Sequence, residues 1–82
     1  MKYQYEPEGV CSYFIDLELE EGIIKAVNFS GGCDGNLKAI SKLVTGKKAR
    51  EVAELLQGNT CGDRPTSCAD QLSRALFQAL KA

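Results

Sequence analysis

The segment from Cys11 to Phe29 constrains the fold most strongly, because apolar and polar side chains alternate along it on both sides of a turn sequence. In its first half, polar residues alternate with four apolar ones, the period-two pattern of a strand buried on one face: Tyr13, Ile15, Leu17 and Leu19. Phe14 is the exception. A second apolar run, Ile23 to Phe29, follows Glu20-Glu21-Gly22, which favours a three-residue loop with Gly22 in the left-handed conformation. The sequence therefore predicts a β-hairpin.

A three-residue loop also fixes the register of the predicted hairpin. The expected cross-strand neighbours are Leu19 with Ile23, Ile15 with Val27, Tyr13 with Phe29, and Cys11 with Gly31. Cys11 would then lie at the open end of the hairpin, and Cys33 follows Gly31 by only two residues. We therefore expect these two cysteines to lie close together.

Three helices are predicted after the hairpin, because the spacing of apolar residues changes from two to the helical period. The first follows Cys33 and carries Leu37, Ile40 and Val44, with Asp34 or Asn36 as the expected cap. The second runs from about Lys48 to Leu56 and stops at Gly58. The third carries an apolar face along its length: Leu72, Ala75, Leu76, Ala79 and Leu80.

Two cysteines stand where these helices begin. Cys33 precedes the first helix, while Ser67, Cys68 and Asp70 are typical of the N-cap, first and third positions of the last helix. The free N–H groups and the dipole at a helix N-terminus favour thiolates, the form of cysteine that binds metals or attacks electrophiles. Cys61 lies between them in the loop from Gly58 to Pro65, without a predicted geometry.

Strands followed by helices indicate an α+β domain in which three helices cover one face of a small antiparallel sheet of two or three strands. Tyr3 and Tyr5, before Pro7, are expected to supply a third strand at the sheet's edge. No repeat, linker or low-complexity tract interrupts residues 1–82, so one domain is predicted. A domain of this size has a small core and gains stability from an additional link between parts of the chain.

Composition limits the classes of function. The chain has four cysteines and no histidine, and its net charge of −1 argues against a nucleic-acid binder of the basic-patch kind. Residues 1–5 lack the apolar stretch of a secretory signal and no transmembrane run follows, so we expect a cytoplasmic protein with reduced thiols rather than structural disulfides. The lysines around the first two helices fit a solvated helix face, with a small acidic partner as the alternative.

Five short motifs together resemble the small TSCPD-domain family over nearly the whole chain. They are Cys11-Ser12, Glu21-Gly22-Ile23-Ile24, Gly31-Gly32-Cys33-Asp34-Gly35-Asn36-Leu37, Cys61-Gly62 and Thr66-Ser67-Cys68-Ala69-Asp70. Ala69 stands where the name-giving motif has proline, and either residue is acceptable in a first helical turn. The resemblance implies a relation to cobalamin-dependent ribonucleotide reductases, which carry this domain near their C-terminus. Some stand-alone members are labelled ribonucleoside-diphosphate reductase for that reason.

A weaker resemblance is to the U-type iron–sulfur cluster scaffolds. These proteins also have a cysteine before a hairpin, one opening a helix and one opening the C-terminal helix, which correspond here to Cys11, Cys33 and Cys68. Tyr13 and Ser67 replace the scaffold's aspartate and histidine, so its usual fourth ligands are missing. Cys61 can complete a four-thiolate site in their place.

The leading hypothesis is therefore a metal site formed by Cys11, Cys33, Cys61 and Cys68. Thiolates suit both zinc and an iron–sulfur cluster, and the sequence does not separate the two. The spacing is less diagnostic than that of zinc ribbons, because no pair shows the C-x2-C pattern.

Three alternatives stay open. One is a redox pair formed by Cys61 and Cys68 in an accessory protein for a reductase, since a chain of this length cannot house the reductase itself. In an interaction module, the cysteines would be small buried residues. Acid–base catalysis would need Asp34, Asp63, Asp70 or a lysine as base, and no nucleophile motif accompanies them. We expect the partner to be another protein, and we expect the chain to bind neither a membrane nor a nucleic acid.

Overall fold

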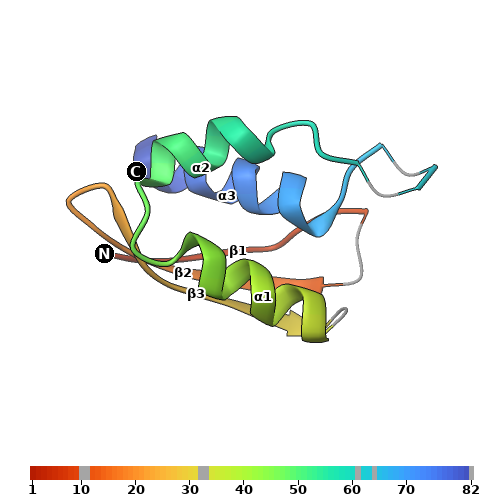
Figure 1. The fold of residues 1–82 in the computed structure, drawn as a ribbon, viewed down its shortest axis with the longest axis horizontal. Helices are drawn as coiled ribbons and strands as arrows, with labels where there is room; N and C mark the ends of the chain where they lie inside the picture. Colours follow the sequence, from red (N-terminus) through yellow and green to blue (C-terminus); the bar gives the residue numbers. More distant parts are fainter. Residues whose placement is uncertain (10–11, 32–33, 61, 64, 82) are drawn as a thin grey trace.

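The computed structural model describes residues 1–9, 12–31, 34–60, 62–63 and 65–81. Its elements follow one another in the predicted order, three strands and then three helices (Figure 1). They are β1 (Lys2–Tyr5), β2 (Ser12–Glu20), β3 (Ile23–Gly31), α1 (Asp34–Val44), α2 (Ala49–Leu56) and α3 (Cys68–Lys81). The strands form an antiparallel sheet in the order β1-β2-β3. The α+β fold and the third strand containing Tyr3 and Tyr5 are thus confirmed.

One hydrophobic core joins the sheet to the helices. Ile15, Leu17 and Leu19 alternate along β2 and are at most 4% exposed, which confirms the period-two prediction for this strand. They pack in one cluster with buried residues of β3 and of the helices, which therefore cover the same face of the sheet. The helical and β3 members of the cluster are Ile24, Val27, Val44, Ala49, Val52, Ala53, Leu72, Ala75, Leu76 and Ala79.

The predicted register of the hairpin is wrong by one to two residues. Glu20 pairs with Ile23, so that only Glu21 and Gly22 form the turn, and both have positive φ (53° and 79°), as type I′ turns require. Gly22 is left-handed as predicted, but Glu21 shares this conformation, which shortens the loop.

An irregularity beyond the turn shifts the register further. Leu19 pairs with Ile24 and Glu18 with Ala26, so Lys25 is an extra residue in β3 and forms a β-bulge. From there on Ile15 lies opposite Phe29 rather than Val27, and Tyr13 is not paired with Phe29. A second irregularity between Ser12 and Phe14 places Ser12 opposite Gly31. The predicted pairing of Cys11 with Gly31 is therefore incorrect, and Cys11 itself lies outside the described residues.

The helix boundaries agree with the sequence predictions to within one or two residues. α2 begins at Ala49 and ends at Leu56, two residues before Gly58. At the start of α3, the Asp70 backbone N–H donates to Ser67 Oγ at 3.1 Å, which confirms Ser67 as the N-cap. α1 begins at Asp34, so Asp34 and Asn36 are its first and third residues, and neither stands at the predicted N-cap position ahead of the helix.

The connection between α1 and α2 is fixed to the hairpin by backbone hydrogen bonds. The Ile24 N–H donates to Lys47 O at 2.9 Å, the Gly46 N–H to Ile24 O at 2.8 Å, and the Ala49 N–H to Gly22 O at 2.8 Å. These bonds extend the ladder of the sheet at the turn end of β3. The relative position of α1 and α2 is therefore set by the sheet.

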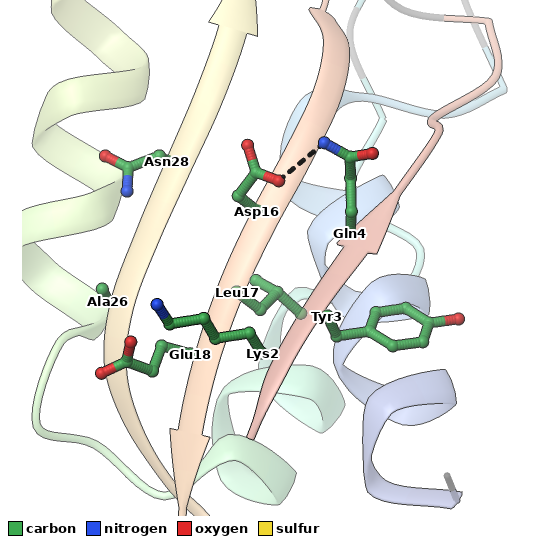
Figure 2. A pocket seen from close by; sticks show the side chains of 8 residues that line it. All are labelled: Lys2, Tyr3, Gln4, Asp16, Leu17, Glu18, Ala26 and Asn28. Carbon is green, nitrogen blue, oxygen red and sulfur yellow. Dashed lines mark hydrogen bonds between the residues drawn. The ribbon is translucent and has the colours of Figure 1, made fainter.

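The other face of the sheet carries polar side chains (Figure 2). Lys2 lies beside Glu18, and Gln4 Nε2 donates to Asp16 Oδ1 at 2.9 Å, while Tyr3 and Leu17 alternate with them toward the core. Among the residues described, no helix has the length and apolar character needed to cross a bilayer.

Candidate functional site

Four element ends that adjoin the cysteines in sequence lie at the same end of the molecule (Figure 1). They are the start of β2, the end of β3, the start of α1 and the start of α3. The hairpin turn lies at the opposite end. This cysteine end, defined by Ser12, Gly31, Asp34 and Cys68, is the candidate functional site.

The first turn of α3 is the described part of this site with the densest polar contacts. Ser67 caps the helix and its hydroxyl also donates to Asn59 O at 2.5 Å, while Asn59 Nδ2 donates back to Ser67 Oγ at 3.3 Å. The loop that follows α2 is thereby attached to the start of α3. Since Cys61 comes two residues after Asn59 in sequence, this contact anchors the chain on one side of Cys61.

Asp70 is the buried charge beneath this turn, with a side chain only 4% exposed. Its carboxylate accepts hydrogen bonds from the Gly58 N–H at 2.7 Å and from Thr66 Oγ1, and Arg74 Nε lies 3.2 Å from Oδ2. Burial alone raises the pKa of Asp70, but the hydrogen bonds from Thr66 and Gly58 and the charge of Arg74 outweigh it, so the pKa is lowered from its ordinary value of 3.8. Asp70 is therefore ionised at neutral pH and serves as a structural acceptor.

Gln71 and Thr66 connect the same turn to the segment between β1 and β2. Gln71 Nε2 donates to Thr66 Oγ1 at 3.0 Å, and Gln71 Oε1 accepts from the Glu8 N–H at 3.2 Å and from Tyr5 Oη at 3.3 Å. Burial is the main cause that raises the pKa of Tyr5, so this phenol keeps its proton for the hydrogen bond.

Gly9 completes this contact by a close approach of backbone to side chain. Its φ is 71°, and a methyl group at its Cα would lie 3.3 Å from Thr66 Cγ2. Cys11 follows Gly9 by two residues, and Cys68 follows Thr66 by two. The contact between Gly9 and Thr66 therefore lies two residues before each of these cysteines in sequence. Across residues 1–9, 12–31, 34–60, 62–63 and 65–81, no buried side-chain nitrogen or oxygen lacks a hydrogen-bond partner.

Of the predicted metal ligands, only Cys68 lies within the described residues. It is the first residue of α3, as the sequence predicts, and it is half-buried. Cys11, Cys33 and Cys61 lie outside the described residues. Within the part of the chain that is described, no group of three or more histidine, cysteine or acidic side chains is arranged to hold a metal ion.

The polar face of the sheet forms a second candidate, a hollow of about 510 Å³ (Figure 2). Its described lining residues include no thiol, and the one hydroxyl among them, Tyr3 Oη, points away from the polar side chains and donates to Gln78 Oε1 at 2.9 Å (Figure 2). Of its two acids, Asp16 accepts from Gln4 and Glu18 lies opposite Lys2. This lining offers charged surface for contacts with solvent or a partner, without a nucleophile beside a base.

The polar network around α3 was only partly predictable from the sequence. Ser67 and Asp70 have the three-residue spacing of a capping box, which indicated the helix start. In a capping box the acidic side chain accepts a hydrogen bond from the backbone N–H of the cap residue. The Asp70 carboxylate instead accepts hydrogen bonds from Gly58 and Thr66. The burial of Gln71, which is 1% exposed, had no local signal because its partners lie in the β1–β2 segment.

Comparison with known proteins identifies the family but supplies no characterised relative. The family model described as the TSCPD domain matches residues 1–80, so the chain belongs to the TSCPD-domain family. No curated protein and no solved structure matches it.

Proposed function

We propose that this member of the TSCPD family binds a metal ion or an iron–sulfur cluster through Cys11, Cys33, Cys61 and Cys68. The observation that carries the proposal is the convergence of element ends in Figure 1. Ser12, Gly31, Asp34 and Cys68 begin or end their elements at one end of the molecule. Each of the first three is within two residues of Cys11 or Cys33 in sequence.

The pairing at the open end of the hairpin supports the first two ligands. Ser12 lies opposite Gly31 in the sheet, with strands separated by about 5 Å at such a pair. Cys11 is one residue from Ser12 and Cys33 two residues from Gly31, and consecutive Cα atoms are about 3.8 Å apart. These chain lengths are short enough for both thiols to reach one small ligand, as the proposal requires.

The contacts around Ser67 and Thr66 support the other two ligands. Asn59 is hydrogen-bonded to Ser67, which places the chain before Cys61 beside the residue before Cys68. Gly9 lies against Thr66, which relates the chain before Cys11 to the same turn. These contacts are made by residues that are close to the cysteines in sequence. They favour one site shared by the thiols over four independent thiols.

The donor chemistry fits a thiophilic metal. Four thiolates suit tetrahedral zinc and the iron of a cluster alike, whereas the chain has no histidine to contribute. A cytoplasmic, reducing compartment, as the sequence predicts, would keep the thiols available. In a domain with so small a core, a metal bound only by the folded state would also stabilise the fold.

A thiol redox role is the competing function, and the contact between Asn59 and Ser67 favours it equally. The hypothesis assigns Cys68 as the attacking thiolate and Cys61 as the resolving thiol of an accessory protein related to ribonucleoside-diphosphate reductase. Such a protein would hold no metal in its dithiol form and would form a disulfide under mild oxidation. A protein-interaction module with incidental cysteines would do neither.

Substitution of single cysteines tests the metal site. We expect Cys33→Ser and Cys68→Ser each to lower metal content and the melting temperature together, by more than about 5 °C, since about 1 kcal/mol shifts the midpoint of a domain this small by 4–8 °C. Ser12→Ala, next to Cys11, is the matched control and should change neither quantity. The proposal is wrong if both cysteine variants keep the metal content and the melting temperature of the wild type.

A further inference from the structure

A contiguous apolar surface lies between α1 and α2, apart from the network at the start of α3. Leu43 is 72% exposed and Leu55 is 81% exposed, although the chain places its other leucines of α1 and α2 in partly or fully buried positions. Single exposed leucines are common on soluble proteins, but these two border one groove. The Leu43–Leu55 patch comprises Ile40, Leu43, Val44, Lys47, Glu51, Val52, Leu55 and Leu56.

The groove in this patch has room for side chains from outside. Its volume is about 290 Å³. That is roughly twice the ~150 Å³ of an apolar cavity left by deleting one leucine side chain from a core. Val44 and Val52 form its buried floor. The patch thus combines two projecting leucines with a hollow that fits two leucines.

The charges at the rim limit the choice of occupant. Lys47 and Glu51 are the charged members of the patch, one of each sign, so the rim is neutral and does not favour a strongly acidic or basic partner. A two-fold axis that passes between these two side chains would bring Lys47 of one copy to Glu51 of the other, twice. It also places the projecting leucines of each copy in the groove of the other, which is the self-complementarity that a two-fold dimer requires.

The patch is also held in place before any partner binds. Lys47, at its rim, accepts a hydrogen bond from the Ile24 N–H at 2.9 Å, and Ala49, at the start of α2, donates to Gly22 O at 2.8 Å. Both bonds join the patch to the β3 end of the sheet. A preformed surface costs little ordering entropy on association.

From this shape and charge, we propose that the chain forms a two-fold dimer through the Leu43–Leu55 patch. The occupant of each groove is a second copy of this chain. The inference makes no use of the proposed metal site, and no cysteine is among the described residues of the patch.

Sedimentation equilibrium of the untagged protein over a range of concentrations tests the dimer. We expect a monomer–dimer equilibrium in the wild type, and a rise of about tenfold or more in the dissociation constant for Leu43→Glu and for Leu55→Glu. Phe14→Glu is the matched control, because Phe14 is also an exposed apolar residue (40%) but lies on β2 outside the patch. It should leave the dissociation constant unchanged.

Charge reversal tests the two-fold geometry. Lys47→Glu and Glu51→Lys should each weaken the dimer, because each places like charges opposite one another, whereas an equimolar mixture of the two variants should dimerise again. A wild type that is monomeric at every concentration, a dimer unaffected by both leucine variants, or a mixture no more associated than its components would overturn the proposal. Because both leucines are exposed, circular dichroism should show all variants folded.

Discussion

Replacing Asp70 by asparagine removes one negative charge from beneath the first turn of α3 and leaves the side chain nearly isosteric. Two hydrogen bonds to this carboxylate come from Gly58 and Thr66, and a bond to a charged group contributes about 1.5–3 kcal/mol. The pair with Arg74 adds at most about 1 kcal/mol, because the Arg74 side chain is 57% exposed. The amide keeps one acceptor oxygen, so we expect Asp70→Asn to lose about 2 kcal/mol of unfolding free energy at neutral pH.

The pH dependence of this loss has a definite sign. The pKa of Asp70 is lower in the folded protein than its ordinary value of 3.8, so the folded state favours the ionised carboxyl. The stabilisation is fully present above pH 3.8 and disappears as the pH falls through the lower pKa of the folded state. The difference between wild type and Asp70→Asn should therefore shrink as the pH falls below about 4.

Urea denaturation followed by circular dichroism, from about pH 7 down to about pH 2, measures this difference. Asp63→Asn is the matched control, because Asp63 is an exposed acid of the preceding loop, and its effect should stay within about 0.5 kcal/mol. If Asp70→Asn matches the wild type at pH 7, or if its deficit grows as the pH falls, the role assigned to the carboxylate is refuted.

Three smaller substitutions test the turn and the helix contacts by thermal or urea unfolding. Gly22→Ala should cost about 1 kcal/mol, because Gly22 has a φ of 79° that alanine adopts only with strain, and an unchanged stability would contradict the type I′ turn. Gly35→Ala, in α1 with open space around its Cα, should stabilise by up to about 1 kcal/mol, and a loss would contradict its helical conformation. The buried Ser73 hydroxyl donates to Ala53 O at 2.6 Å and so joins α3 to α2. Ser73→Ala removes this hydrogen bond and should lower the unfolding free energy by about 1 kcal/mol. An unchanged unfolding free energy would mean that the bond contributes nothing to stability.

The elements of this fold were predictable because their signals are local. The alternation of Ile15, Leu17 and Leu19 depends only on neighbouring residues, and so does the cap formed by Ser67. The confirmed α+β architecture follows from these local signals, because an apolar sheet face and apolar helix stripes must cover one another.

The register of the hairpin was not predictable in the same way. A hairpin loop that contains Gly22 can have two or three residues, and its length depends on whether Glu21 adopts a positive φ. The bulge at Lys25 has no signal in the sequence, since it adds one residue without a glycine or proline.

The candidate site shows the same division. The positions of Cys33 and Cys68 near helix starts could be predicted from capping patterns, and Cys68 indeed opens α3. The buried network of Asp70 and Gln71 could not, because some partners of these side chains, Gly58 and Glu8, come from the end of α2 and from the segment after β1. Long-range polar contacts depend on packing that the sequence pattern does not encode locally.

The proposed metal site can be tested by the metal content of the untagged protein, purified without oxygen and measured by elemental analysis beside its visible absorption spectrum. We expect either near-stoichiometric zinc without colour or iron with a brown chromophore, and in both cases fewer titratable thiols than the four cysteines of the chain until the metal is removed. Protein without metal, in which all four thiols titrate freely, would contradict a metal site formed by Cys11, Cys33, Cys61 and Cys68.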